Sequence, residues 1–334
     1  MFVLEEGRRW DANLLLGYGS YEQLRAGVEL QQMNLFGRAH RARLELVQSM
    51  KSSRGEYSYT VPELFGESVD GTAKLFGLQR DEPDFRRQEY GATFELKRPL
   101  PWFNTDATLG YTFQSLRNTN NDLSTSGVDQ KQVNVASVDL ELTRDRRDSP
   151  LRPRHGSRLF TRLEVASRDF GGQTDYQRVE LGAAFHTSWG GSRWIHLGLT
   201  HGAIMTQGAG DDTLLPVNKR FFPGGDGSIR GYQLGEASPR GADGRFLGAK
   251  TYLLANAELE QALTSAWSAV VFGDALGMAV RLADYPFNEK LYTLGVGVRY
   301  QTPIGPVRLE YGRNLNPRPG DPGGTLLVAV GFPF

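Results

Sequence analysis

Hydrophobic and polar residues alternate with a period of two along several segments of the chain. Over residues 291–301 the apolar side chains share one parity, and the polar side chains and glycines share the other. A period of two predicts a β-strand whose two faces lie in unlike environments. The same alternation recurs over residues 89–97, 106–114, 307–312 and 325–334. The pattern therefore predicts an all-β protein.

Two all-β architectures fit this alternation: a β-sandwich with one wet face, and a barrel in an outer membrane. The polar faces carry many glycines and charges of both signs, which suits a water-filled lumen. Tyr292 and Tyr300 stand at the two ends of one apolar face. Such aromatic ends are expected of a lipid-facing strand that reaches both membrane interfaces. We therefore favour a transmembrane antiparallel β-barrel.

The connections between these segments differ in length. Short turns are expected at residues 34–37, 98–101, 189–192 and 304–306, and longer polar connections at 51–56, 117–129, 207–247 and 314–324. Short turns on one side and longer loops on the other are typical of outer-membrane barrels, with the short turns periplasmic.

Counting segments between these breaks predicts about 16 strands, within the even-numbered range of such barrels. Both termini are expected to be periplasmic, and the first strand, near residues 10–20, to close against the last. No linker and no low-complexity segment is visible in the sequence, so residues 1–334 are expected to form one barrel domain.

Composition changes this interpretation little, but it excludes other classes. The 334 residues include no cysteine, which excludes a disulfide framework, a thiolate metal site and a cysteine nucleophile. The 38 basic and 38 acidic residues balance, which argues against binding of nucleic acid. A mean hydropathy of −0.42 would by itself indicate a soluble protein. Glu5 and Glu6 follow the first four residues, so no leader is visible, and we expect a cytosolic, mature or trimmed chain.

Signatures of enzymes and metal sites are missing from the sequence. The five histidines form no His-Glu-x-x-His motif, and no Gly-x-Ser-x-Gly motif occurs. His196 and His201 are five residues apart, which places them on opposite faces of a strand and disfavours a shared metal ion. We predict a non-enzymatic protein with no metal and no cofactor.

A glycine-rich stretch over residues 220–232 is the most distinctive local feature. No Gly-Lys-Ser/Thr follows it, so a phosphate-binding loop is disfavoured. The stretch places Arg230 between Ile229 and Gly231. An anchoring role for this arginine requires carboxylates on the lumen face, because a guanidinium can bind carboxylates in a bidentate manner.

Three carboxylates satisfy that requirement. Glu258 and Glu260 share the polar face of the next expected strand, and Asp274 lies in the strand after it. All three are expected to point into the lumen.

Ile229-Arg230-Gly231-Tyr232 resembles the Val/Ile-Arg-Gly-Phe/Tyr motif of loop six in the superfamily of outer-membrane assembly and translocation barrels. The longer strings RFFPGGDGSIRGY, NLFGRAH, LYTLGVGVRYQTPIGPVRLEYGRNLNP and the terminal GFPF are most similar to the TamA branch, the barrel subunit of the translocation and assembly module. The similarity extends over essentially the whole chain.

The resemblance implies a 16-stranded barrel in a Gram-negative outer membrane, with a long loop six folded into the lumen. The loop-six arginine of the family contacts acids on strands twelve and thirteen. By position these are Arg230, with Asp274 on strand thirteen and Glu260 on strand twelve, and Glu258 as the second choice. The aromatic residues of the motifs are Phe221, Phe222 and Phe272.

The resemblance also implies weak pairing between the last strand, ending at Phe334, and the first. Gly331 and Pro333 weaken that last strand, since proline donates no ladder bond and glycine packs poorly. Members of the family carry POTRA domains ahead of the barrel, whereas this chain begins almost at strand one. We expect either that such domains were removed or that this is a barrel-only relative.

The function implied is that of an assembly factor that inserts or translocates β-rich clients, such as autotransporters. Opening the seam between the first and last strands would offer a client strand an edge for pairing. The expected partners are outer-membrane lipids, unfolded outer-membrane clients and a TamB-like protein anchored in the inner membrane. Two alternatives stay open: phospholipid transport together with the TamB-type partner, and a simple diffusion pore.

Overall fold

The described part of the chain contains sixteen β-strands. The computed structural model describes residues 9–119, 132–206, 215–303 and 305–330. Its strands are β1 (Trp10–Gly19), β2 (Gln23–Leu35), β3 (His40–Ser49), β4 (Ser52–Val61), β5 (Asp70–Asp81), β6 (Arg86–Leu100), β7 (Thr105–Thr119), β8 (Gln132–Asp145), β9 (Gly156–Ala166), β10 (Tyr176–Ser188), β11 (Arg193–Thr206), β12 (Thr251–Ala262), β13 (Trp267–Ala279), β14 (Glu289–Thr302), β15 (Gly305–Asn314) and β16 (Gly324–Val330). Short 3-10 helices lie in the connections: η1 (Leu64–Gly66), η2 (Pro101–Phe103), η4 (Arg168–Phe170), η6 (Val217–Lys219) and η7 (Leu282–Phe287).

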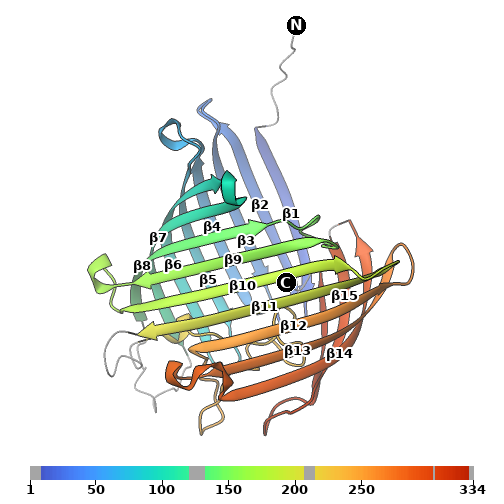
Figure 1. Cartoon of the computed structure of the whole chain (residues 1–334). Helices are drawn as coiled ribbons and strands as arrows, with labels where there is room; N and C mark the ends of the chain where they lie inside the picture. The colour runs from blue at the N-terminus through green and yellow to red at the C-terminus, as the bar shows by residue number, and fades with distance from the viewer. Residues whose placement is uncertain (1–8, 120–131, 207–214, 304, 331–334) are drawn as a thin grey trace.

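All strands belong to one antiparallel sheet in chain order, so that each strand pairs with the next along the sequence. The sheet curls into a nearly closed barrel, in which the colour sequence runs around a common axis (Figure 1). The prediction of an antiparallel barrel of about 16 strands is confirmed. Among the described residues, no helical segment is long and apolar enough to cross a membrane.

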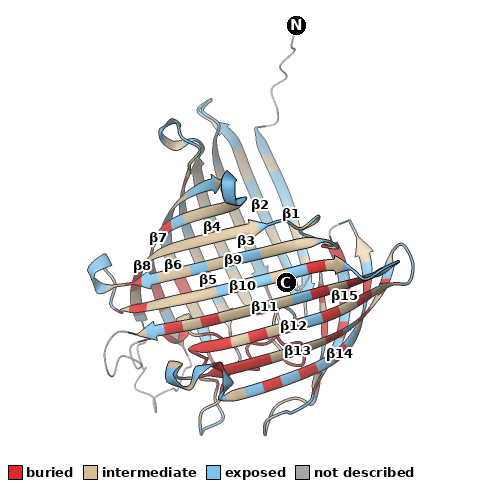
Figure 2. Cartoon of the chain, viewed as in Figure 1, coloured by how far each residue is buried: buried red, intermediate tan, exposed pale blue. Residues whose placement is uncertain are grey.

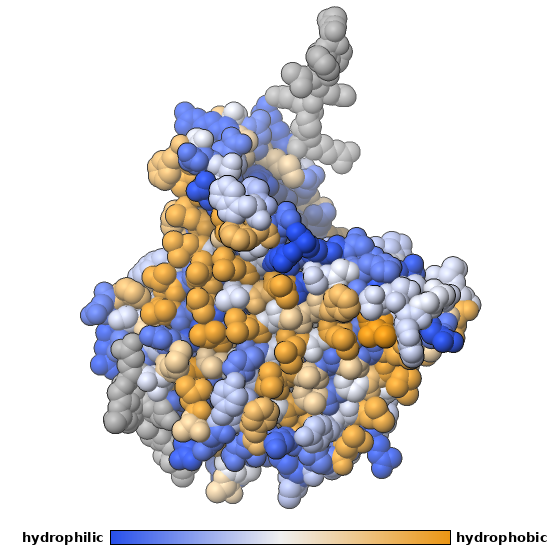
Figure 3. Space-filling view, in the orientation of Figure 1, coloured by the Kyte–Doolittle hydropathy of each residue, from blue (hydrophilic) through white to orange (hydrophobic). Residues whose placement is uncertain are grey.

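The outer wall of the barrel is apolar. On β14, Tyr292, Leu294, Val296, Val298 and Tyr300 all lie exposed, and the 57% exposure of Val296 is the highest of the five. Figure 3 shows apolar residues spread over the side of the barrel that faces the viewer. Exposed apolar area of this extent needs a non-aqueous surrounding, and alternation of this kind is the pattern of a lipid-facing strand.

Buried side chains lie mainly on one side of the lumen. They concentrate in β12–β15, whereas β1–β5 are largely intermediate or exposed (Figure 2). In β1–β5 only Ser49 and Gly71 are buried. The difference arises because the long β11–β12 connection, called loop six below, packs inside the barrel against the later strands.

Some predicted turns lie elsewhere than expected. The longer connection expected at residues 51–56 is wrong, because β4 begins at Ser52 and only Met50 and Lys51 join it to β3. β4 has serine and glycine on its outer face at Ser53 and Gly55, so the segment lacks the apolar alternation that marks the other strands. The turn expected at 98–101 is also displaced, since β6 continues to Leu100.

The remaining predicted turns agree with the structure only in part. The turn at residues 189–192 and the connection at 314–324 lie where they were predicted. Gly305 and Pro306 belong to β15, and Ile304 lies outside the described residues. Residues 117–119 belong to β7, and the rest of the connection expected at 117–129 lies outside the described residues.

The alternation of faces predicts different costs for one charge placed on neighbouring residues. Leu75 points outward from β5 with 60% of its surface exposed, whereas Phe76 lines a polar lumen pocket beside Glu95 and Asp139. Leu75→Arg should lower the free energy of unfolding by about 2–4 kcal/mol, because an arginine on the lipid face is buried in hydrocarbon. Phe76→Arg is the matched control and should cost less, and urea unfolding from lipid vesicles measures both. Equal losses would contradict the assigned faces.

Candidate functional site: the loop-six anchor and the seam

Loop six enters the lumen and buries its motif completely. Ile229 and Arg230 have no exposed surface, and Tyr232 retains 1%. A charged side chain this deeply buried is stable only when it is paired. The contacts of Arg230 therefore decide what holds the loop.

Arg230 binds Asp274 on β13 in a bidentate manner. Its Nε donates to Asp274 Oδ2 at 3.0 Å and its Nη2 to Oδ1 at 2.8 Å, and its backbone N–H also donates to Oδ2 at 3.0 Å. Nη1 donates to Glu258 Oε2 on β12 at 2.7 Å and lies 3.5 Å from Glu310 on β15. The guanidinium also stacks over the Phe272 ring, 3.6 Å from its centroid. Burial would lower the pKa of Arg230, but the hydrogen bond and charge of Asp274 outweigh it and raise the pKa above its usual value.

The preference for Glu260 as the partner on β12 requires correction, because Glu258 contacts Arg230 instead. Asp274 pairs in register with Asn256 on β12. Every second residue of β12 faces the lumen, so Glu258 is the first lumen-facing residue after Asn256 and Glu260 is the second. Glu260 instead accepts a hydrogen bond from Arg299 at 3.1 Å.

A second layer of charges extends the cluster, and the sequence interpretation did not single it out. Arg299 on β14 donates to Glu258 Oε2 at 2.8 Å and to Glu310 Oε1 at 2.7 Å, so Glu258 bridges Arg230 and Arg299. Arg308 on β15 pairs with Asp226 of loop six at 2.8 Å. The parity of β14 and β15 placed these residues on the polar face, but their convergence depends on the register across several strands.

Gly231 allows the closest approach between loop six and the wall. Its carbonyl accepts hydrogen bonds from Asn314 Nδ2 at 2.9 Å and from Thr325 Oγ1 at 2.8 Å. A Cβ at this position would lie 1.7 Å from Asn314 Oδ1, so no other residue fits without displacing the wall. Through Thr325 the motif directly contacts the last strand, β16.

Tyr232 ties the motif to the β15–β16 connection. Its hydroxyl donates to Asp321 Oδ2 at 3.0 Å, and Arg318 Nε donates to the same oxygen at 2.9 Å. Burial would raise the pKa of Asp321, but the hydrogen bond from Arg318 outweighs it and holds the pKa below its usual value. Asp321 is therefore ionised at neutral pH and is a lasting partner for both groups.

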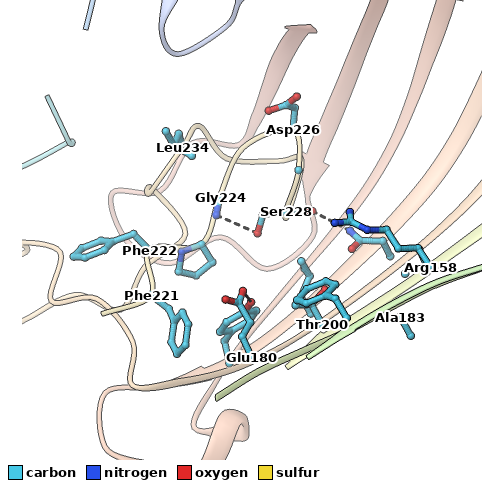
Figure 4. A pocket seen from close by; sticks show the side chains of 18 residues that line it. Arg158, Glu180, Ala183, Thr200, Phe221, Phe222, Gly224, Asp226, Ser228 and Leu234 are labelled. Atoms are coloured by element: carbon cyan, nitrogen blue, oxygen red, sulfur yellow. Dashed lines mark hydrogen bonds between the residues drawn. The ribbon is translucent and has the colours of Figure 1, made fainter. Parts of the chain in front are cut away.

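The other motif aromatics pack at the base of loop six. Phe221 lies edge-on to Tyr252, with ring centroids 4.8 Å apart, and Phe222 contacts Phe85 at 5.5 Å. A cavity of about 490 Å³ separates this part of the loop from the inner wall of β9–β12. Figure 4 shows Phe221 and Glu180 beside this cavity, with Arg158 reaching toward it from the wall.

Three buried side chains in the described residues have the geometry of a metal site, namely His196, Glu258 and Glu260. Both carboxylates already bind guanidinium groups: Glu258 contacts Arg230 and Arg299, and Glu260 contacts Arg299. A cation entering here would meet these positive charges, so the residues present do not fit a metal ion.

The sheet is not sealed between its two ends. Within the described residues no ladder joins β1 to β16, and the two ends of the sheet meet at Ser20, just after β1. The backbone N–H of Ser20 donates to the Val328 carbonyl at 3.1 Å, and its hydroxyl accepts from the Val328 N–H at 2.5 Å. Gly331, Pro333 and Phe334, which were expected to weaken this seam, lie outside the described residues.

The model of the Omp85 superfamily domain matches residues 34–334. The chain belongs to the Omp85 superfamily. It is 25% identical over 317 residues to the outer membrane protein assembly factor BamA of Nitratidesulfovibrio vulgaris, a match that covers 90% of this chain and 38% of that protein. It is also 25% identical over 317 residues to the chloroplastic outer envelope protein 80 of Arabidopsis thaliana, covering 84% of this chain and 40% of that protein.

The crystal structure of BamA from Haemophilus ducreyi lacking POTRA domains 1–3 has the same fold, with a TM-score of 0.83 at 20% identity. That match covers 98% of this chain and 71% of the other. This Omp85 barrel thus spans about two fifths of the length of the two curated relatives. Membership of the superfamily confirms the broader resemblance and agrees with the prediction of a non-enzymatic barrel. The two curated relatives are a BamA and an outer envelope protein, and neither is a TamA.

The contacts of Arg230 and Arg299 predict that the two glutamates of β12 contribute unequally to the stability of this Omp85 barrel. Glu258→Gln removes the charge that faces both Arg230 and Arg299, so it should lower the free energy of unfolding by about 3–5 kcal/mol. It should also speed tryptic cleavage of loop six at Arg240 and Arg245. Glu260→Gln is the matched control, with the same chemical change two residues along, and should have the smaller effect on both measurements. A larger effect at Glu260 would refute the contact pattern.

Proposed function

We propose that this chain is the barrel of an outer-membrane assembly factor, and that a client strand pairs with the edge exposed at the β1–β16 seam. The observation that carries the proposal is the lack of a ladder between β1 and β16 in the described residues. An assembly factor among the relatives of the chain supports the same function.

The physical basis is the cost of unpaired backbone groups in lipid. Spanning structures in a bilayer must satisfy their N–H and C=O groups internally, and each unsatisfied group costs several kcal/mol. An edge strand is a template for pairing with another chain. A client strand added by β-augmentation would satisfy the facing groups of β1 or β16, so the seam favours client binding.

Loop six supports this role by holding the seam from inside. Gly231 contacts Thr325 on β16, and a small pocket between loop six and the seam is lined by Tyr18, Leu234 and Leu327. With the loop fixed by Arg230, the end of the sheet keeps its position while its outer edge is unpaired. The motif and the seam thus form one unit.

Finer assignments rest on the sequence strings described above. We place the barrel in a Gram-negative outer membrane with periplasmic termini, and we treat residues 1–334 as one barrel domain. The strings support the TamA branch and, with it, a TamB-type partner and clients such as autotransporters. Phospholipid transport with that partner is the second function that these strings support. A wide diffusion pore is disfavoured because loop six packs within the lumen.

Cross-linking the seam should block client insertion. The chain has no cysteine, so Ser20→Cys with Val328→Cys introduces the only thiols, at residues whose backbones are in contact. Oxidation should abolish insertion of an unfolded autotransporter β-domain into vesicles that contain the barrel, and reduction should restore it. Gel mobility of the protease-protected client measures insertion.

The control pair is Val298→Cys with Leu309→Cys, which are register partners on β14 and β15, away from the seam. Oxidation of this pair should leave insertion unchanged, since these strands are already paired. Undiminished insertion by the oxidised seam pair would overturn the proposed mechanism.

A further inference from the structure

The outer wall of β1–β7 contains a groove of about 960 Å³. Two neighbouring rows of outward-facing residues line it, each running across consecutive strands by register. The apolar row consists of Leu14, Val28, Leu46, Gly55, Gly77 and Tyr90. The polar row consists of Leu16, Ala26, Gln48, Ser53, Gln79, Gln88 and Arg117. This surface is separate from the loop-six anchor.

Two glycines create the hollow. Gly55 and Gly77 are register partners on β4 and β5, and they lie between the exposed side chains of Leu46 and Tyr90. A Cβ on Gly77 would meet no atom within 4 Å, so neither packing nor a positive φ requires glycine there. A larger residue would fit and would fill the groove. The empty space is therefore available to a ligand.

The two rows have different chemistry at different depths. The polar row lies near the ends of its strands. Gln48 is the second-to-last residue of β3, and Arg117 is two residues before the last residue of β7. Gln88 donates to Gln79 at 2.9 Å and Ser53 to Gln48 at 2.6 Å, so these polar groups pair with one another. Arg117 is exposed and forms no ion pair with any described residue.

We propose that this groove binds one anionic glycerophospholipid, with an acyl chain along the apolar row and the headgroup phosphate at Arg117. The groove opens on the lipid-facing wall, so its occupant comes from the bilayer. An apolar floor with a cation at the interfacial end matches an amphiphile with a negative head. The proposal goes beyond client insertion, and because Leu14 and Leu16 belong to β1, the bound lipid would lie beside the seam.

The test measures retained lipid on the full chain. The protein is purified in detergent, equilibrated with equal amounts of phosphatidylglycerol and phosphatidylcholine, and analysed by native mass spectrometry. The wild type should retain one phosphatidylglycerol. Gly77→Leu should reduce its retention about tenfold by filling the groove, and Arg117→Gln should abolish the preference for phosphatidylglycerol by removing the charge-assisted contact.

Gly273→Leu is the matched control. Gly273 is a half-buried glycine on β13 that shares the outward parity of the exposed Val271, and the atom nearest to its Cβ position is 3.8 Å away. This variant should retain lipid as the wild type does. Equal retention by Gly77→Leu and the wild type, or equal retention of both lipids by the wild type, would overturn the proposal. Selective retention of added lipid A over phosphatidylglycerol would overturn the assignment to a glycerophospholipid.

Discussion

The arrangement of the lumen depends on the buried ion cluster around Arg230. Asp274, Glu258 and Glu310 approach this guanidinium from three strands, and Arg299 pairs with Glu258 and Glu310. Withdrawing loop six would strand these carboxylates without their partner, at a cost of several kcal/mol. The loop is therefore a fixed part of the wall. Its Gly231 carbonyl extends the contact to Thr325, so the same cluster positions the last strand from inside.

Much of this architecture could be predicted from the sequence, because parity is a local property. The alternation on β14 and β15 identified the lumen face, and the resemblance placed Arg230 opposite Asp274. The choice between Glu258 and Glu260 could not be predicted, since both share one face and only the register of β12 with β13 separates them. The convergence of Arg299 with Glu310 depends likewise on inter-strand register. The connection expected at residues 51–56 failed for another reason: the outer face of β4 bears serine and glycine where other strands are apolar.

The outer wall and the seam differ in how stable they are in the hydrocarbon of a membrane. The exposed apolar residues of β14 lie stably in hydrocarbon, whereas the unpaired edges of β1 and β16 do not. A barrel that only needed stability would close this edge, as most do. Here the hydrogen bonds between the two ends of the described sheet are those of Ser20 with Val328, and no ladder joins β1 to β16. This combination of a firmly anchored loop and an unpaired edge is what favours an assembly function for this Omp85 barrel.

Site-specific cross-linking of a client during insertion is the most direct test of that account. A cysteine in the terminal strand of an unfolded autotransporter β-domain would be offered to Ala12→Cys on β1 or to Leu197→Cys on β11, where the strand is paired on both sides. The account predicts that the client cross-links to β1 and not to β11 while insertion is in progress. Equal cross-linking at both strands, or none at β1, would contradict client pairing at the seam.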